Sequence, residues 1–248
     1  MATIDPPDDG EAFDLPIEDL TELLAIGDME VEGRMPYSSN ATLLVTMTKG
    51  DTSHRAIYKP GQGERPLWDF PDGLYKREVA MFELSDQLGF DVVPPTLLVD
   101  AELGPGSLQA FVKAHFSEHY FTMMEEGIGG EDLRQLCVLD LIGNNTDRKA
   151  GHCLLGGDGR VYGIDHGLAF HAQFKLRTVM WDFVDEEIPS ASMEAVAAFV
   201  EAGPRDSLAR LLDSFEVDAM VSRARALLDE GRFPEDDTGG QRYPWPLV

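Results

Sequence analysis

Two aspartates flank a short predicted hairpin in the stretch "TDRKAGHCLLGGDGRVYGIDHG", which covers residues 146–167. The runs "HCLL" and "RVYGID" face each other across "GGDG", which is a strong hairpin turn signal. Asp147 precedes the hairpin and Asp165 ends it, so we expect the two carboxylates to converge. A base, a metal-binding carboxylate and a lysine are the groups that phosphoryl transfer requires. The stretch therefore predicts phosphotransfer chemistry.

The spacing of these residues follows the protein-kinase pattern. In that pattern a catalytic Asp is followed five residues later by a metal-binding Asn, then by a hairpin, a metal-binding Asp and a Gly. Asp147 is followed five residues later by His152, and "DHG" begins at Asp165 without an insertion. We therefore expect Asp147 to act on the acceptor hydroxyl and Asp165 to bind metal. His152 stands in the Asn place, and Asn144 and Asn145 precede the loop as amide ligands that compensate for it.

A second register is possible, because Asn145 lies five residues after Asp140. In that register the segment leading to the hairpin is too long, and Asp140 lies inside an apolar helix. The register that uses Asp147 is therefore favoured. Arg148, directly beside Asp147, is predicted to be a functional charge of the catalytic group.

The elements that must position these residues fall into two groups. A short helix ending at Gly27 and three β-type runs come first, followed by a helix stopped by Gly89 and an extended segment that starts at a Pro pair. After "GPGSLQAFV" the chain changes to helices. We expect these helices at residues 114–126, 131–142, 192–200 and 217–228.

This order predicts an α+β, bilobal, protein-kinase-like fold. A small antiparallel β-rich N-lobe with a helix would precede a mostly helical C-lobe that contains the catalytic-loop hairpin. We expect a disordered acidic tail over residues 1–16, the N-lobe over residues 17–108 and the C-lobe over residues 109–248.

Two stretches resemble known kinases. "TDRKAGHCLL…GIDHG" resembles the D-R-H-x-x-N and D-x-G pair of the phosphatidylinositol 3- and 4-kinase-like superfamily, the atypical kinases. "AIYKPGQGERPLWDFPDGLYKREVAMFELSDQLGFDVVPPT" is similar to the matching lobe of those kinases and of secretory-pathway protein kinases. Across residues 25–185 the chain also resembles an uncharacterised actinobacterial phosphatidylinositol-kinase-like family. The resemblance describes ancestry and does not specify a lipid substrate.

The resemblance implies roles for further residues. Lys59 matches the strand lysine that contacts the nucleotide phosphates, and Glu78 matches the helix acid that pairs with it. The alternative is that both are ordinary surface charges. "GSLQAFV" matches the hinge, where Gln109 to Val112 would offer backbone groups to an adenine and Phe111 would pack near it.

The turn "MPYSSN" lies where a phosphate-binding loop is expected, between the first two strands. It lacks G-x-G-x-x-G, but lipid-kinase relatives use a serine-bearing loop at this place. Ser38, Ser39 and Asn40 are therefore candidates to present N–H groups and hydroxyls to phosphate. The alternative is a plain polar hairpin turn.

Composition limits the possible partners. The formal net charge is −25, from 45 acidic and 20 basic residues, which opposes binding to nucleic acid or to an anionic membrane. No apolar run approaches the roughly 18 residues of a membrane span, so we expect no stable membrane insertion and a cytoplasmic location. The two cysteines are too few for a disulfide framework and are expected to be reduced.

Together these features predict an ATP-dependent phosphotransferase that uses Mg²⁺ or Mn²⁺. Its acceptor would be a hydroxyl on a protein or a small molecule. Two alternatives remain open at this point. One is transfer of AMP by a kinase-fold enzyme, and the other is a nucleotide-binding pseudokinase that serves as a regulatory module, suggested by His152 in the Asn place.

Overall fold

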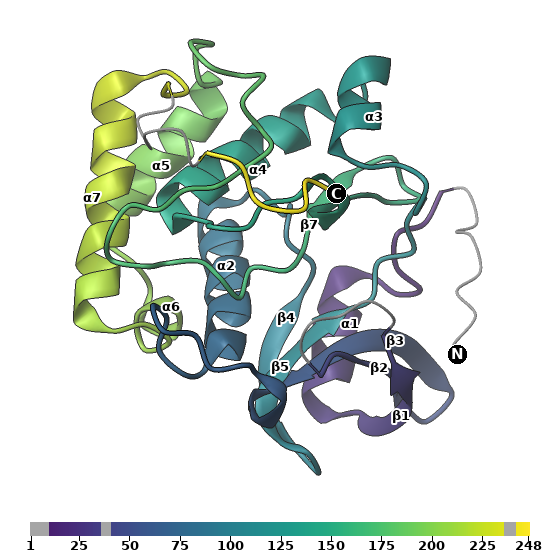
Figure 1. Ribbon diagram of the computed structural model, residues 1–248. Coiled ribbons are helices and arrows are strands. Elements are labelled where there is room, and N and C mark those ends of the chain that lie inside the picture. Colours follow the sequence, from purple (N-terminus) through teal and green to yellow (C-terminus); the bar gives the residue numbers. More distant parts are fainter. Residues whose placement is uncertain (1–9, 36–40, 236–241) are drawn as a thin grey trace.

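The computed structural model describes residues 10–35, 41–235 and 242–248, which form two lobes (Figure 1). An antiparallel sheet and helix α1 form the lower lobe in this view, and the upper lobe is largely helical. The predicted α+β, bilobal arrangement is therefore confirmed.

The larger sheet has five antiparallel strands in the order β1-β2-β3-β5-β4. The strands are β1 (Asp28–Arg34), β2 (Leu43–Lys49), β3 (Thr52–Pro60), β4 (Thr96–Ala101) and β5 (Gly104–Ala110). A second sheet is the predicted hairpin, formed by β6 (Cys153–Leu155) and β7 (Val161–Gly163). The hairpin belongs to the upper lobe (Figure 1).

The helices within the described ranges are α1 (Ile17–Ile26), α2 (Leu74–Leu88), α3 (Tyr120–Glu126), α4 (Gly130–Gly143), α5 (Ser190–Ala202), α6 (Asp206–Ala209) and α7 (Ser214–Glu230). Two 3₁₀ turns are η1 (Gly61–Gly63) and η2 (Ala150–His152). None of these helices is long and apolar enough to span a membrane.

Side-chain alternation along β3 determines which residues face the second lobe. Ala56 and Tyr58 are buried in a core that the sheet shares with α1. Because successive side chains of a strand point to opposite faces, Lys59 projects from the face that α1 does not cover. The strand thus places one lysine on the side of the sheet that looks toward the larger lobe.

Helix α2 belongs to the core of the larger lobe, although its sequence lies within the range predicted for the N-lobe. Its buried apolar residues pack in the same cluster as α4, α5 and α7. Arg77 adds buried polar contacts, because its Nε donates to Ala169 O at 3.0 Å and it is ion-paired with Glu216 of α7. This buried ion pair between Arg77 and Glu216 connects α2 to α7 of the larger lobe, and removal of either partner would leave a buried charge without its partner.

Two element predictions were wrong. "GSLQAFV" was expected to form the hinge, but its residues up to Ala110 belong to strand β5, which lies between β3 and β4. The strand begins with Gly104, Pro105 and Gly106, residue types that are depleted in strands, so the local pattern does not reveal it. The helix predicted for residues 114–126 begins only at Tyr120, because His119 and Thr122 form a capping box there.

Residues 10–16, which the sequence assigned to a disordered tail, are ordered against the linker between the lobes. Lys113 N donates to Ala12 O at 2.9 Å, and Ala12 is buried. The Asp14 carboxylate contacts His54 Nδ1 at 2.8 Å, and Gly10 N donates to Gly157 O at 2.8 Å. This segment therefore contacts the sheet, the linker and the β6–β7 hairpin. The rest of the predicted tail lies outside the described residues.

Candidate active site

Lys59 of β3 links the two lobes through two carboxylates. Its Nζ lies 2.5 Å from Glu78 Oε1 of α2 and 2.9 Å from Asp165 Oδ1, which follows β7. The Glu78 side chain is 4% exposed, whereas that of Asp165 is 52% exposed. The Glu78 carboxylate is thus buried against Lys59, whereas the Asp165 carboxylate is accessible to solvent.

Charge pairing explains the ionisation states of these groups. Burial alone would lower the pKa of Lys59, but the charges of Asp165 and Glu78 outweigh it and raise that pKa above its usual value. The charge of Lys59 in turn holds the pKa of Asp165 well below its usual range. Lys59 is therefore charged and Asp165 is ionised at neutral pH.

The backbone around Asp165 is held in an uncommon conformation. Asp165 has φ of 59°, in the left-handed region that non-glycine residues rarely adopt. The flanking residues are both hydrogen-bonded: Ile164 N donates to His152 O at 3.0 Å, and His166 N donates to Glu78 Oε2 at 2.8 Å. Such strain persists where surrounding contacts fix it, and it is concentrated at functional sites.

Asp147 lies on the loop between α4 and the hairpin, and its backbone is also fixed. Its backbone N–H donates to Asn145 Oδ1 at 3.0 Å, and its Oδ2 lies 2.9 Å from Lys149 Nζ. Burial raises the pKa of Asp147, while Lys149 opposes that rise. The negative charge of Asp165 also raises this pKa.

Lys149 was not identified by the sequence reasoning. It lies two residues after Asp147, and its backbone is extended, with φ of −89° and ψ of 162°. Residues two apart in an extended segment point to the same side. The spacing of two residues could therefore have indicated that Lys149 lies beside Asp147, the candidate base.

His152, the last residue of the 3₁₀ turn η2, also contacts Asp165. Its Nε2 lies 3.4 Å from Asp165 Oδ2, and the side chain is 14% exposed. Burial lowers the pKa of His152 to about 4, so the imidazole is neutral at pH 7. Its Nδ1 is buried without a hydrogen-bond partner among the described residues. The residue in the Asn place is therefore a neutral imidazole next to the exposed carboxylate.

Arg148 does not lie in the site as a catalytic group. It is fully buried, and its guanidinium binds both carboxylate oxygens of Asp140, at 2.7 and 2.9 Å. The same side chain donates to the carbonyls of His152 and Ile164, both at 3.1 Å. Arg148 therefore holds the two ends of the hairpin together. The prediction that Arg148 is a functional charge of the catalytic group is corrected to a positioning role, because its side chain is fully buried.

Asn145 is likewise occupied within the loop. Its Nδ2 donates to Asp140 Oδ1 at 2.9 Å, while its Oδ1 accepts from Asp147 N. Both ends of the amide are used, so the structure does not present Asn145 as a free ligand beside Asp165. Asn144 is also occupied, because its Nδ2 donates to the carbonyls of His171 and Gln173.

The predicted hinge residues are distributed differently from the expectation. Gln109 is paired within the sheet, and its side chain donates to Thr96 Oγ1 at 2.8 Å. Phe111 N donates to Arg55 O, and Val112 is buried in the linker beyond β5. The linker therefore begins at Phe111. The predicted phosphate-loop residues Ser38, Ser39 and Asn40 lie outside the described residues.

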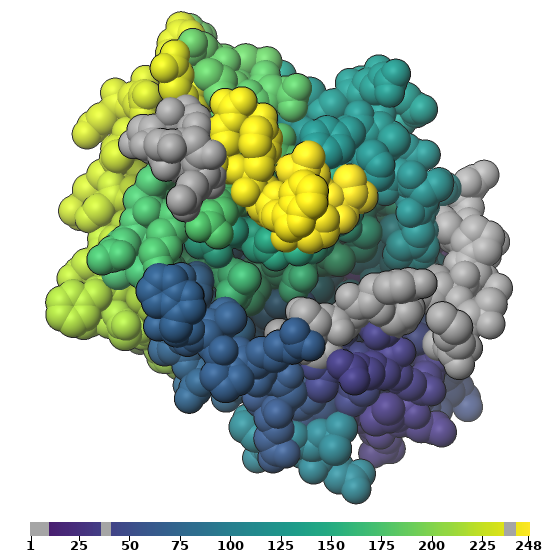
Figure 2. Space-filling view, viewed as in Figure 1, coloured from purple at the N-terminus to yellow at the C-terminus, as the bar shows by residue number. Residues whose placement is uncertain are grey.

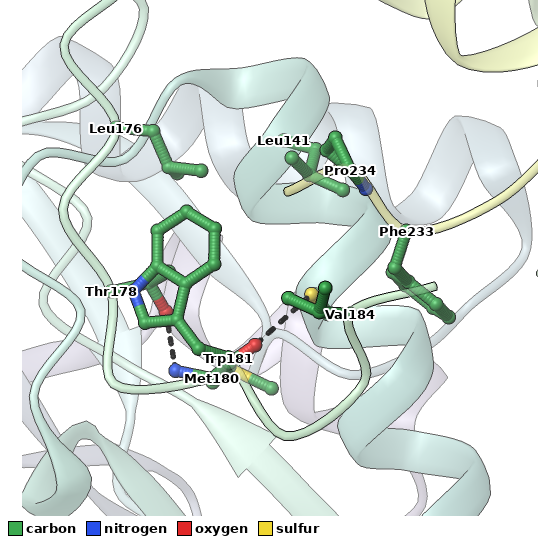
Figure 3. A pocket seen from close by; sticks show the side chains of 9 residues that line it. Leu141, Leu176, Thr178, Met180, Trp181, Val184, Phe233 and Pro234 are labelled. Carbon is green, nitrogen blue, oxygen red and sulfur yellow. Dashed lines mark hydrogen bonds between the residues drawn. The ribbon is translucent and has the colours of Figure 1, made fainter. Parts of the chain in front are cut away.

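A small apolar pocket lies elsewhere in the larger lobe (Figure 3). Its lining includes Cys137 and Leu141 of α4 and Trp181 of the segment that follows Asp165. The Cys137 thiol donates to Met180 O at 3.8 Å, and both cysteines of the chain are free and buried. None of the lining residues belongs to the Lys59–Asp165 site. The pocket lies where residues 176–184 pack against helix α4.

The overall fold is that of atypical protein kinases. A solved structure of the Golgi casein kinase matches with a TM-score of 0.54 and 16% identity, covering 86% of this chain and 73% of that one. The same kinase with Mn/ADP bound matches with a TM-score of 0.54 and 16% identity, over 94% and 80%. Hydra Fam20 with sugar matches with a TM-score of 0.53 and 12% identity, over 86% and 87%. These likenesses give the chain a kinase-like fold of the Fam20 type, without specific support for the phosphatidylinositol kinase label.

The sequence itself has a curated relative. Protein Rv2133c of Mycobacterium tuberculosis is 37% identical over 266 aligned positions, which cover 92% of this chain and 95% of the relative. The chain belongs to the same family as that protein. No protein-family model matches the chain.

Proposed function

We propose that the protein is an atypical kinase that moves the γ-phosphoryl group of ATP to a hydroxyl, with a divalent metal. The observation that carries this proposal is the convergence of Lys59, Glu78 and Asp165, at 2.5 and 2.9 Å, from three separate parts of the chain. Isolated surface charges do not require such a partly buried arrangement of side chains from three elements. The Mn/ADP complex of the Golgi casein kinase, which has the same fold, supports nucleotide and metal as ligands.

Each residue has a defined part in the proposed reaction. Asp147 accepts the proton of the acceptor hydroxyl as that oxygen bonds to the γ-phosphorus, and the bond to the bridging oxygen breaks to release ADP. Lys59 and Lys149 hold negative charge on the phosphates, since both are cations beside the two aspartates. Asp165 offers a half-exposed carboxylate to the metal.

The donor set fits a metal that arrives with the nucleotide. Within the described residues, no group of three or more His, Cys, Asp or Glu side chains is arranged to hold an ion alone. Asp165 with His152 supplies two protein ligands, and phosphate oxygens and water would complete the coordination. When bound, the metal would neutralise charge on the transferred phosphoryl group.

His152 favours Mn²⁺ over Mg²⁺ at this site. A neutral imidazole nitrogen is a better ligand for transition-metal ions than for Mg²⁺, which prefers oxygen. We expect activity with Mn²⁺ to exceed activity with Mg²⁺, and His152→Asn to reduce that ratio. An unchanged ratio in the variant would remove His152 from the metal site.

Isotope labelling tests the proposed reaction against its alternatives. The purified chain is incubated with ATP labelled at the α or at the γ position, with Mn²⁺ or Mg²⁺, and Asp147→Asn is the matched control. We expect the acceptor to become labelled with γ-labelled ATP and not with α-labelled ATP. With Asp147→Asn, we expect the acceptor to remain unlabelled. Label from the α position alone would instead show AMP transfer. Nucleotide-induced stabilisation without any label would favour the regulatory module.

A further inference from the structure

Residues 242–248 lie on the face of the larger lobe beside the candidate catalytic loop. In Figure 2 this segment, in yellow, extends over the surface above the hollow between the lobes. Its contacts are mainly backbone contacts with two parts of the site. One is the segment after Asp165, and the other is the 3₁₀ turn η2 that separates Asp147 from β6.

The first backbone contact extends an existing pair of strands. Arg148 and Thr178 form a parallel bridge, in which Arg148 N donates to Arg177 O and Val179 N donates to Arg148 O. The Thr178 N–H points the other way and donates to Arg242 O at 3.0 Å. The added segment therefore uses the free edge of this pair, as extended peptides do when they bind to an exposed strand edge.

The second backbone contact lies next to the catalytic groups. Ala150 N donates to Leu247 O at 2.8 Å, and Ala150 directly follows Lys149. A Cβ atom built on Gly151 would lie 3.9 Å from Val248 Cγ1, so the segment also passes close to the next residue of the loop. The segment thus passes within three residues of Asp147, where an acceptor hydroxyl must arrive in the proposed reaction.

Few side chains of the segment are buried. Pro244 is its buried residue, while Trp245 is 87% exposed and Val248 is 60% exposed. A segment with few buried apolar contacts detaches at low free-energy cost. Tyr243 carries the only hydroxyl among the side chains of residues 242–248, so the segment offers no Ser or Thr to the site.

We propose that residues 242–248 occupy the docking face of an extended polypeptide acceptor, and that this acceptor must displace them. The proposal rests on the proposed kinase function, and it specifies the acceptor as a polypeptide rather than a small molecule. The backbone donors of Thr178 and Ala150 recognise an extended main chain of any sequence, and they align its side chains with Asp147.

The test uses a chain without residues 242–248 and a fluorescent peptide of the sequence RYPWPLV. We expect the peptide to bind the shortened chain saturably by fluorescence anisotropy, and to bind the full chain at least tenfold more weakly. A peptide of the same composition in the order VPLRWYP should bind the shortened chain with an affinity within about threefold of RYPWPLV, because the two donors contact the main chain. Absence of binding to a folded shortened chain, or equal binding to both chains, would overturn the proposal.

Turnover provides the second arm of the test. With a degenerate mixture of Ser, Thr and Tyr peptides at low concentration, the shortened chain should transfer γ-phosphate about 10 to 100 times faster, because a face free in only 1–10% of molecules lowers apparent affinity by that factor. RYPWPLV should compete with the peptide mixture and not with ATP. Competition with ATP, or unchanged peptide transfer, would contradict the proposal.

If the shortened chain does not fold, Pro244→Asp in the full chain serves instead, with the adjacent, exposed Trp245→Asp as the matched control. The first should admit RYPWPLV and the second should not. Equal behaviour of the two variants would refute the docking face. Failure of the kinase proposal is distinguishable, because it would abolish γ-label transfer while RYPWPLV binding persisted.

Discussion

Replacing Lys59 by Met tests the central ion-pair cluster most directly. The substitution keeps the length of the side chain and removes its charge. Removal of one member of a buried ion pair costs about 3–5 kcal/mol of unfolding free energy. Solvent reaches Asp165, whose side chain is 52% exposed, whereas Glu78 at 4% keeps only the His166 N–H at 2.8 Å. We therefore expect a smaller loss, about 2–3 kcal/mol.

Thermal unfolding measures that loss. For a chain of this size about 1 kcal/mol corresponds to about 2–4 °C, so the Tm of Lys59→Met should fall by about 4–12 °C. Lys49→Met is the control, because Lys49 Nζ lies 2.7 Å from Glu22 Oε1 in a pair whose side chains are 51% and 61% exposed. Solvent screens an exposed pair of this kind, so the Tm of the control should change little.

The same variants test the assignment of Lys59 to the nucleotide. ADP with Mn²⁺ at about 100 times its Kd should stabilise the unsubstituted chain by about 2.7 kcal/mol. Lys49→Met should retain this nucleotide-induced shift, and Lys59→Met should lose most of it, together with at least a roughly 100-fold loss of phosphoryl transfer. An intact shift in Lys59→Met, or equal destabilisation by the two substitutions, would refute the reasoning.

Three further predictions concern the loop between α4 and the hairpin. Asp147→Asn should reduce γ-phosphate transfer by about 10²–10⁴-fold while the ADP-induced Tm shift persists; loss of the shift would show that Asp147 instead binds nucleotide. Lys149→Met removes an interaction that lowers the pKa of Asp147, so that pKa rises further and the acidic limb of kcat/KM should move to higher pH. An unmoved limb would exclude Asp147 as the titrating base. Arg148→Met should lower unfolding free energy by about 3–5 kcal/mol in urea denaturation, since it strands the buried carboxylate of Asp140; a loss below 1 kcal/mol would contradict its positioning role.

Elements with a strong local signal were predictable from the sequence. The apolar spacing and terminal glycines placed α1 and α2, and the turn "GGDG" placed the β6–β7 hairpin. Strand β5 was missed because it begins with Gly104, Pro105 and Gly106, which indicate a loop, although the strand pairs with β4 across a tight turn. Residues 10–16 were missed because an acidic composition does not reveal a segment whose order comes from backbone contacts with Lys113 and Gly157.

The candidate site was predictable where spacing is fixed by local structure. The hairpin lies between Asp147 and Asp165 and fixes the number of residues that separate them. Matching this spacing to the kinase pattern was therefore sufficient to identify both as candidates. The burial of Arg148 could not be predicted from the same spacing. Arg148 is adjacent to Asp147, but its side chain leaves the loop on the opposite side and enters the interior. Adjacency in the sequence therefore identified a neighbour of the site rather than a member of it.

The position of α2 between the two lobes has a consequence for any movement of one lobe against the other. This helix packs against β4 and β5 of the sheet as well as against α4, α5 and α6. Its Glu78 contacts Lys59 of the sheet and accepts a hydrogen bond from the His166 backbone of the larger lobe. A change in the separation of the lobes would therefore be felt directly at Glu78.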